Sequence, residues 1–205
     1  KHASFILELD ANVAVLKNLD GEIYAGLDNG KLYKITINSA ENSAPNSTAV
    51  NSLANSTKQN SAENSTTLNS ASGSISKTLI FALPSSKNYL DEPMGATIFD
   101  VDKLGEKYAF LYNGDAFEKM LGIFAGGKIT HYKLPMTGIK NVYFYDENTV
   151  ILLGLGSEIL YFDLPSGKVS FEQKLTIASL GGSAYDRAGG TLLISCEGGI
   201  VFYFD

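Results

Sequence analysis

The side chains best suited to metal binding or nucleophilic attack are few in this sequence and stand far apart. The two histidines are His2, beside the N-terminus, and His131, between Thr130 and Tyr132, and the single cysteine is Cys196. A structural zinc site needs four such ligands and a catalytic one three, usually at close spacing. The sequence therefore predicts no metal centre and no disulfide framework.

A short acidic motif, Asp100-Val101-Asp102, is the next candidate. Because side chains alternate along a strand, both carboxylates would lie on one face, where a Ca²⁺ ion could use them as ligands. The interpretation we favour is simpler: the two aspartates end a strand and are solvated in the turn before Lys103.

The segment Gly154–Glu158 (GLGSE) superficially resembles a nucleophile elbow, but its Gly–Ser spacing is different and no helical pattern follows it. It also lacks the third glycine of a dinucleotide-binding loop. A tight hairpin turn explains it better, since Gly-Gly stands at the equivalent position 42 residues later. No pair of carboxylates has a spacing that marks it for acid–base work, so we expect a protein that is not an enzyme and has no cofactor.

Two predicted loops, Lys87–Met94 and Asn113–Lys119, are the candidates for a partner surface. In the second loop Phe117 has charged neighbours, and an exposed aromatic residue in such a setting is typical of interface anchors. The alternative is that Phe117 folds back onto its own sheet. The predicted partner surface consists of Asp91, Glu92, Phe117 and Lys119.

Composition limits the function classes further. The chain has 205 residues with 22 acidic and 16 basic side chains, a net charge of −6, and 44% hydrophobic residues, enough for the core of one domain. Without a Lys/Arg cluster we expect no nucleic-acid partner, and without an apolar run near 20 residues we expect no membrane insertion. The chain starts at Lys1, which we interpret as a processed or trimmed N-terminus.

Residues 38–76 differ from everything around them. Among these 39 residues are 8 Asn, 11 Ser, 4 Thr and 6 Ala and no aromatic residue, and residues 46–54, 55–63 and 64–72 form a nine-residue tandem repeat. Such a tract has too little apolar surface to offset the entropy of ordering it. We predict a disordered insertion at 38–76 within one domain, between a first blade at 1–37 and the remaining blades at 77–205.

Outside this tract the pattern is β throughout, with runs of Val, Ile, Tyr and Phe separated by turn dipeptides such as Asp20-Gly21 and Asn113-Gly114. One turn of helix is expected within Asp115–Leu121. The predicted strands are Val13–Lys17, Glu22–Gly26, Lys31–Ile37, Thr78–Leu83, Ala96–Val101, Lys107–Tyr112, Leu121–Ala125, Lys128–Leu134, Val142–Tyr145, Val150–Leu153, Glu158–Leu164, Val169–Lys174, Leu192–Ser195 and Ile200–Phe204.

An internal repeat indicates how these strands are arranged. Thr149–Asp163 (TVILLGLGSEILYFD) and Thr191–Asp205 (TLLISCEGGIVFYFD) align without a gap at an offset of 42 residues, with five of fifteen positions identical. A period of about 40–45 residues in β-sequence is typical of four-stranded propeller blades. The predicted fold class is therefore all-β, a WD40-like or YVTN-like β-propeller, although its Phe-Asp pairs stand where WD40 repeats carry Trp-Asp.

The number of blades follows from the period. Setting aside the 39-residue tract leaves room for about four blades. The apolar segment Ser4–Leu9 could supply the strand that the last blade lacks and so close the ring. The alternative, an incomplete ring with further blades outside this sequence, is equally open.

Several segments in order resemble one family. They are Asp91–Asp102 (DEPMGATIFDVD), the Asn-Gly loop that ends at Phe117, Lys140–Val150 (KNVYFYDENTV), Glu158–Leu164 (EILYFDL) and Gly198–Val201. Together they resemble the NapL proteins of epsilonproteobacteria, WD40-like propellers encoded with the periplasmic nitrate reductase, over roughly residues 13–37 and 78–205. The resemblance implies a periplasmic, non-catalytic accessory protein that assists maturation of, or electron delivery to, the molybdenum-containing reductase, with subunits of that system as partners.

Two other functions remain open at this stage. One is a protein-binding propeller with an unrelated partner, and the other is an enzyme whose carboxylates come from separate blades at the mouth of the channel. A deep central pocket with converging Asp or Glu side chains would favour the enzyme. A shallow surface of mixed charge would favour binding.

Overall fold

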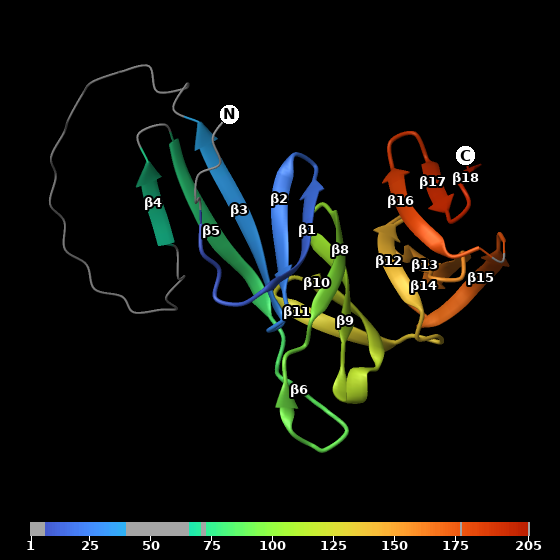
Figure 1. Ribbon diagram of the computed structural model, residues 1–205, viewed down its shortest axis with the longest axis horizontal. Helices are drawn as coiled ribbons and strands as arrows, with labels where there is room; N and C mark the ends of the chain where they lie inside the picture. The colour runs from blue at the N-terminus through green and yellow to red at the C-terminus, as the bar shows by residue number, and fades with distance from the viewer. Residues whose placement is uncertain (1–6, 40–65, 71–72, 177, 205) are drawn as a thin grey trace, which may run out of the picture.

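The computed structural model describes residues 7–39, 66–70, 73–176 and 178–204 (Figure 1). Within these ranges the chain is built of antiparallel strands, and its helical structure is a single 3₁₀ turn, η2 (Asp115–Phe117). None of its described helical structure is long and apolar enough to cross a membrane.

The first sheet has the strand order β1-β2-β3-β5-β4. A two-residue hairpin joins its first two strands, and both turn residues, Asp20 and Gly21, have positive φ angles of 55° and 81°. Such a turn matches the twist of paired strands, which is why the Asp-Gly dipeptide marked it in the sequence. The strands are β1 (Val13–Leu19), β2 (Glu22–Leu27), β3 (Lys31–Ser39), β4 (Thr66–Ser70) and β5 (Gly73–Ala82).

Part of the Asn/Ser-rich tract belongs to this sheet, which differs from the predicted disorder. Strand β5 begins at Gly73, five residues before the predicted Thr78, and β4 pairs with it in the register Leu68 to Ile75. Backbone hydrogen bonds between neighbouring strands form with any side chains, so composition alone underestimates pairing at a sheet edge. The repeats at 46–54 and 55–63 lie outside the described residues.

Three further sheets follow in chain order, with the strand orders β11-β10-β9-β8, β12-β13-β14-β15 and β16-β17-β18. A short hairpin, β6 (Ser86–Lys87) and β7 (Pro93–Met94), precedes them. The strands are β8 (Ile98–Leu104), β9 (Lys107–Asn113), β10 (Lys119–Ala125), β11 (Lys128–Lys133), β12 (Ile139–Phe144), β13 (Thr149–Gly154), β14 (Glu158–Asp163), β15 (Lys168–Lys174), β16 (Leu180–Asp186), β17 (Thr191–Cys196) and β18 (Ile200–Phe204).

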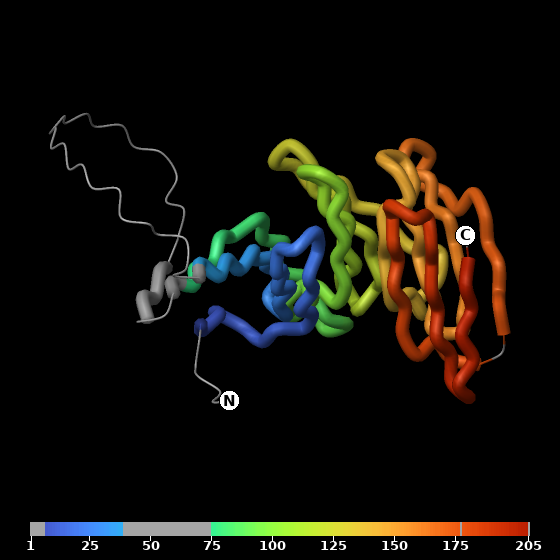
Figure 2. Tube along the Cα trace, turned by 90° about the horizontal axis from the view of Figure 1, so that it is seen from above, coloured from blue at the N-terminus to red at the C-terminus, as the bar shows by residue number. Residues whose placement is uncertain are grey.

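The sheets stack face to face as four successive blades of a β-propeller, which confirms the predicted fold class (Figure 2). Strand β8 contacts both β1 and β12, so the innermost strands of the first three blades lie side by side. Apolar side chains fill each junction: Tyr24 and Phe110 between the first and second blades, Leu121 and Phe144 between the second and third. Burial of these faces is the main force that stacks the blades.

The predicted strands are confirmed, since each overlaps an observed one. A three-residue turn, η2, lies where one turn of helix was expected, but Ala116 and Phe117 in it have positive φ angles, so it is not a regular right-handed turn. The 42-residue repeat is also present in the structure, because β13 and β14 occupy the places in the third blade that β17 and β18 occupy in the fourth. Strand β16 was missed, because its Gly181-Gly182-Ser183 run has low β-propensity and packing against the third blade decides its conformation.

The segment proposed to close the ring is described only in part. Residues 4–6 lie outside the described residues, and residues 7–9 belong to no strand. Leu9 packs against Ala25, Leu27 and Tyr33 of the first blade. A ring-closing strand from this segment stays a prediction.

Candidate functional site

The two aspartates of the acidic motif connect blades, so their interpretation as a solvated strand end is wrong. Strand β8 runs on to Leu104, and Asp100 and Asp102 are buried within it, 2% and 5% exposed. One oxygen of Asp100 accepts a hydrogen bond from the Val142 N–H at 2.8 Å, and one of Asp102 accepts from the Phe144 N–H at 2.7 Å. Both amides belong to β12 of the next blade.

Cations from the first and fourth blades neutralise these carboxylates. The Lys17 ammonium lies 2.8 Å from Asp100 and 4.8 Å from the centre of the Tyr143 ring. The Arg187 guanidinium lies 2.7 Å from Asp102 and also donates to the Phe144 carbonyl at 3.1 Å. Burial raises the pKa of Asp102, and the Phe144 amide and Arg187 oppose that rise. The network holds all four blades to one another around their inner strands.

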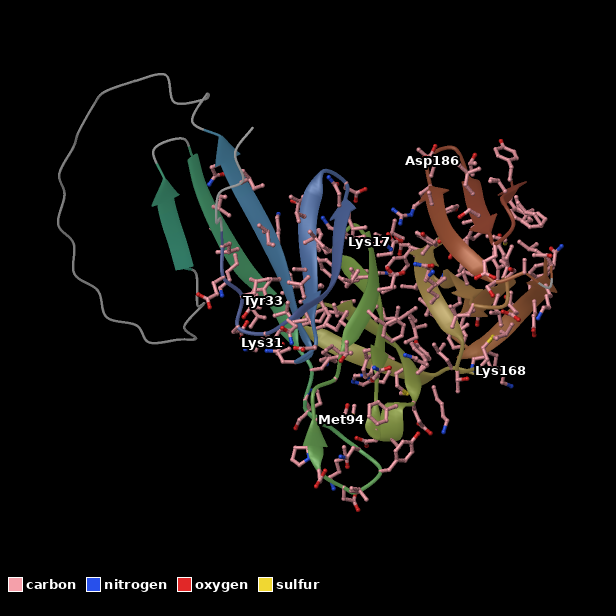
Figure 3. The ribbon with its side chains drawn as sticks, in the orientation of Figure 1. Lys17, Lys31, Tyr33, Met94, Lys168 and Asp186 are labelled. Carbon is pink, nitrogen blue, oxygen red and sulfur yellow. The ribbon has the colours of Figure 1, made fainter. Side chains whose placement is uncertain are left out.

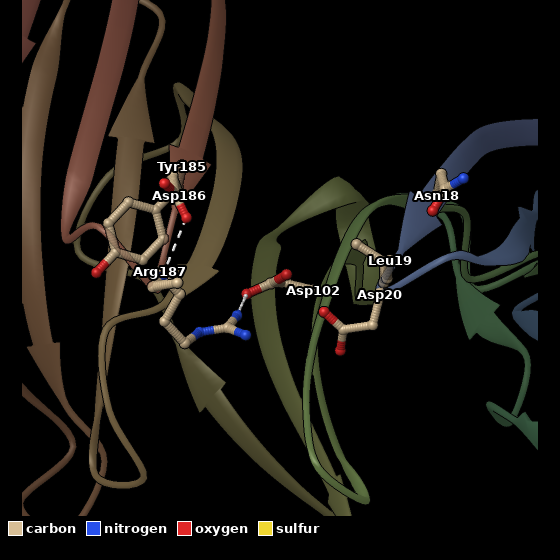
Figure 4. A pocket seen from close by; sticks show the side chains of 8 residues that line it. Asn18, Leu19, Asp20, Asp102, Tyr185, Asp186 and Arg187 are labelled. Atoms are coloured by element: carbon tan, nitrogen blue, oxygen red, sulfur yellow. Dashed lines mark hydrogen bonds and ion pairs between the residues drawn. The ribbon is translucent and has the colours of Figure 1, made fainter.

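An open cleft of about 470 Å³ lies beside this network (Figure 4). Its walls come from the β1–β2 turn of the first blade, from Asp102, and from the end of β16. Three aspartates and one arginine line it: Asp102 is bound by Arg187, Asp186 accepts from the Ala188 N–H at 3.1 Å, and Asp20 lies in the β1–β2 turn on the opposite wall. Among the described residues no three potential metal ligands lie together. The cleft has the mixed charge that we expected of a binding surface.

The predicted partner surface lies elsewhere, on loops that project beyond the blades at the β6–β7 hairpin (Figures 1 and 3). We call residues 87–94 and 115–118 the tip. Asp91 and Glu92 are exposed in its hairpin loop, and Phe117, half exposed, comes from η2. The centres of the Tyr89 and Phe117 rings lie 5.7 Å apart, so the two predicted loops form one surface.

Lys119 lies apart from this surface. Its ammonium donates to the Asn113 side-chain oxygen at 2.7 Å and lies 4.0 Å from the centre of the Phe99 ring. Burial lowers the pKa of this ammonium. Three of the four predicted residues therefore meet at the tip, and Lys119 supports the strand that leads away from it.

Two residues of the tip that the sequence analysis did not single out are its most exposed apolar side chains. Tyr89 is 76% exposed and Leu90 is 77% exposed. The sequence does contain a pattern that could have identified them. They are two large apolar residues in a predicted loop of Lys, Asn, Asp and Pro residues, where burial in the core is not expected.

Hydrogen bonds hold the hairpin loop in one conformation. The Asn88 side-chain oxygen accepts from the N–H groups of Leu90 at 2.8 Å and Glu92 at 3.0 Å, and its amide donates to the Glu92 carboxylate at 2.8 Å. An Asp115 oxygen accepts from the Lys87 N–H at 2.7 Å and fastens the hairpin to η2. The apolar side chains are therefore presented on a rigid frame.

The backbone of the tip is strained. Asp91, Ala116 and Phe117 have φ angles of 60°, 49° and 60°, in the left-handed region that favours glycine. For a bulky residue such as Phe117 this conformation costs about 1–2 kcal/mol, and residues held in this way gather at functional sites. The strain supports a role for the tip beyond folding.

Comparison with known proteins supports the fold. No protein-family model matches the chain, and no curated protein matches it in sequence. Among solved structures it is similar to the β-propeller domain of Cps50 (Swd1) from Myceliophteria thermophila, with a TM-score of 0.50 and 11% identity. The match covers 96% of this chain and 66% of that domain, so the chain spans less than two thirds of it. At this identity the likeness shows a β-propeller fold alone.

Proposed function

We propose that this protein is a non-catalytic β-propeller scaffold that binds another protein through its tip. The observation that carries the proposal is the cluster of Tyr89, Leu90 and Phe117, three large apolar side chains that point into solvent from a strained, hydrogen-bonded frame. Exposed aromatic residues surrounded by polar ones are the usual anchors of protein interfaces.

The frame makes the tip efficient at binding. Ordering a flexible loop on association costs about 0.5–1.5 kcal/mol for each immobilised side chain. Asn88 and Asp115 already hold the backbone of the loop, so binding has to order the side chains of the tip but not its backbone. Burial of the three side chains then contributes about 25 cal/mol for each Å² of apolar surface removed from water.

The narrower proposal is that the partner belongs to a periplasmic nitrate reductase system and that the protein acts in the periplasm. It is supported by the sequence resemblance to NapL proteins over roughly residues 13–37 and 78–205, which includes the tip. On this proposal the blades serve as a rigid support, and the tip contacts a subunit during maturation or electron delivery.

Nitrate reduction in a strain that lacks the gene tests the narrower proposal, with an artificial dye and with the physiological donor. Loss with both donors indicates maturation, and loss with the physiological donor alone indicates electron delivery. Complementation with Tyr89→Ser/Phe117→Ser should fail, whereas Leu16→Ser, an exposed residue of the first blade, should restore the rate. Unchanged rates in the deletion strain would refute the nitrate reductase assignment. A deletion phenotype rescued by the tip variant would refute the role of the tip.

A further inference from the structure

A second candidate site, independent of the tip, lies on the third blade. Tyr145, Tyr161, Ser170 and Phe171 line an open cavity of about 460 Å³, which we call the aromatic pocket. The Tyr161 ring stands nearly perpendicular to both neighbours, with its centre 5.3 Å from that of Tyr145 and 5.6 Å from that of Phe171. The two flanking rings are each about half exposed, at 48% and 49%.

The second blade does not repeat the aromatic residues of this pocket. Two rings of the pocket, those of Tyr161 and Phe171, extend a row of paired residues across the sheet of the third blade, on the face that packs against the fourth blade, and Tyr145 follows the end of β12. The row of the third blade reads Tyr143, Ile151, Tyr161 and Phe171, and the corresponding row of the second blade reads Asp102, Ala109, Ile123 and Thr130. Packing of blades thus does not require aromatic residues at the two outer positions.

Aromatic rings rather than hydrogen-bonding groups dominate the pocket. The one hydroxyl that is not phenolic, that of Ser170, donates to the Tyr161 carbonyl at 3.1 Å and so is already satisfied within the sheet. A ligand here would contact mainly ring surfaces, whose faces carry negative electrostatic potential.

Elsewhere in this protein such faces attract ammonium groups. Among the described residues four lysines lie over rings: Lys17 over Tyr143, Lys77 over Tyr33, Lys103 over Tyr24 and Lys119 over Phe99. In the same part of the chain no lysine or arginine lies over Tyr145, Tyr161 or Phe171. The chain as a whole carries a net charge of −6, which also favours a cationic ligand.

We propose that the aromatic pocket binds an organic cation, a quaternary ammonium group or a methylated ammonium side chain, by cation–π contacts with Tyr145, Tyr161 and Phe171. The same chemistry could come from a free small molecule or from a lysine side chain of a protein partner.

Binding is tested on the full chain by NMR titration, with the aromatic resonances of the three residues assigned. Tetramethylammonium is the probe, and neopentyl alcohol, a neutral molecule of similar shape, is the control. We expect weak, saturable shifts at the three rings with the cation and binding at least about threefold weaker with the alcohol. Equal binding of both, or shifts confined to other residues, would overturn the proposal.

Variants provide a second measurement. Tyr145→Leu and Phe171→Leu keep apolar area but remove a ring, and each should weaken binding of tetramethylammonium about two- to fivefold. Tyr203→Leu, an exposed ring of the fourth blade, is the matched control and should bind as the unchanged protein does. Unaltered affinity in both pocket variants, with unfolding temperatures showing them folded, would contradict the proposal.

Short peptides that contain trimethyl-lysine, lysine or norleucine distinguish the two sources of the cation, a free small molecule and a lysine side chain of a protein partner. A trimethyl-lysine peptide that binds at least tenfold more tightly than tetramethylammonium identifies a partner side chain, because flanking residues then contribute. Similar affinities identify a free small cation. Norleucine binding as well as trimethyl-lysine would again overturn the proposal.

Discussion

Asp102 and Arg187 are 85 residues apart in the chain, yet an oxygen of the first lies 2.7 Å from a guanidinium nitrogen of the second. The same oxygen accepts the Phe144 N–H, so one carboxylate joins the second, third and fourth blades. Together with the ion pair between Lys17 and Asp100, these contacts form a network of charged groups at the inner strands of an otherwise apolar stack of sheets. Apolar burial drives the stacking of the blades, and these few polar contacts add to it, since a buried partner left unsatisfied is costly.

Removal of this carboxylate should destabilise the protein strongly. Asp102→Ala leaves the buried Phe144 amide without its acceptor and the partly exposed Arg187 guanidinium without its carboxylate, and an unsatisfied buried group of this kind costs about 1–3 kcal/mol. Urea denaturation measures the loss. Glu147→Ala removes an exposed pair with Lys107 and should leave the midpoint nearly unchanged. A similarly small effect at both positions would show that the contacts of Asp102 do not hold the blades together.

Acid should weaken the protein through Glu22. Lys34, the Tyr24 hydroxyl and Lys103 hydrogen-bond its carboxylate and lower its pKa from 4.5 to about 2. Because the folded pKa is depressed, the stability from this group is fully present above pH 4.5 and is lost as the pH falls toward 2.

Urea midpoints of the unchanged protein and of Glu22→Gln, measured from pH 6 down to the lowest pH at which each still folds, test this. The difference between the two should be largest above about pH 4.5 and should shrink as the pH falls. A difference that is constant with pH would contradict the assignment.

Gly95 should not tolerate a side chain. A Cβ at this position would lie 2.0 Å from the backbone oxygen of Asp28, which the first blade holds in place. Gly95→Ala should therefore lower the free energy of unfolding by at least about 1–3 kcal/mol, the range for overpacked sites. Gly138→Ala is the control, because the nearest atom to its Cβ would be 3.9 Å away. Equal stability of the two variants in thermal unfolding would refute the close approach.

The strained backbone at Phe117 should make two variants that both lose partner binding differ in stability. Phe117→Gly and Phe117→Ala both lose the ring, but only glycine adopts the φ angle of 60° without steric cost. The glycine variant should therefore be more stable than the alanine variant by about 1 kcal/mol, while both lose partner binding. Calorimetry that finds alanine equally stable would show that the backbone relaxes and stores no strain.

The sequence predicted the blades well and their connections poorly, for a physical reason. Turn dipeptides and apolar runs are local signals, so strands such as β13 and β14 and the 42-residue repeat could be identified directly. The partners that other blades supply to Asp100 and Asp102 lie at least 41 residues away, and no local pattern marks them. Contact between the rings of Tyr89 and Phe117 likewise arises from tertiary structure, although both predicted loops contributed to the surface.

Site-specific photo-crosslinking in the producing cells tests the central claim that the tip binds a protein. Benzoylphenylalanine is placed at Tyr89 and, as a control, at Leu16, another exposed position, on the first blade. We predict one defined crosslinked protein from position 89, none from position 16, and loss of the product when Phe117→Ser is added. Absence of a product from position 89, or the same products from both positions, would contradict the claim.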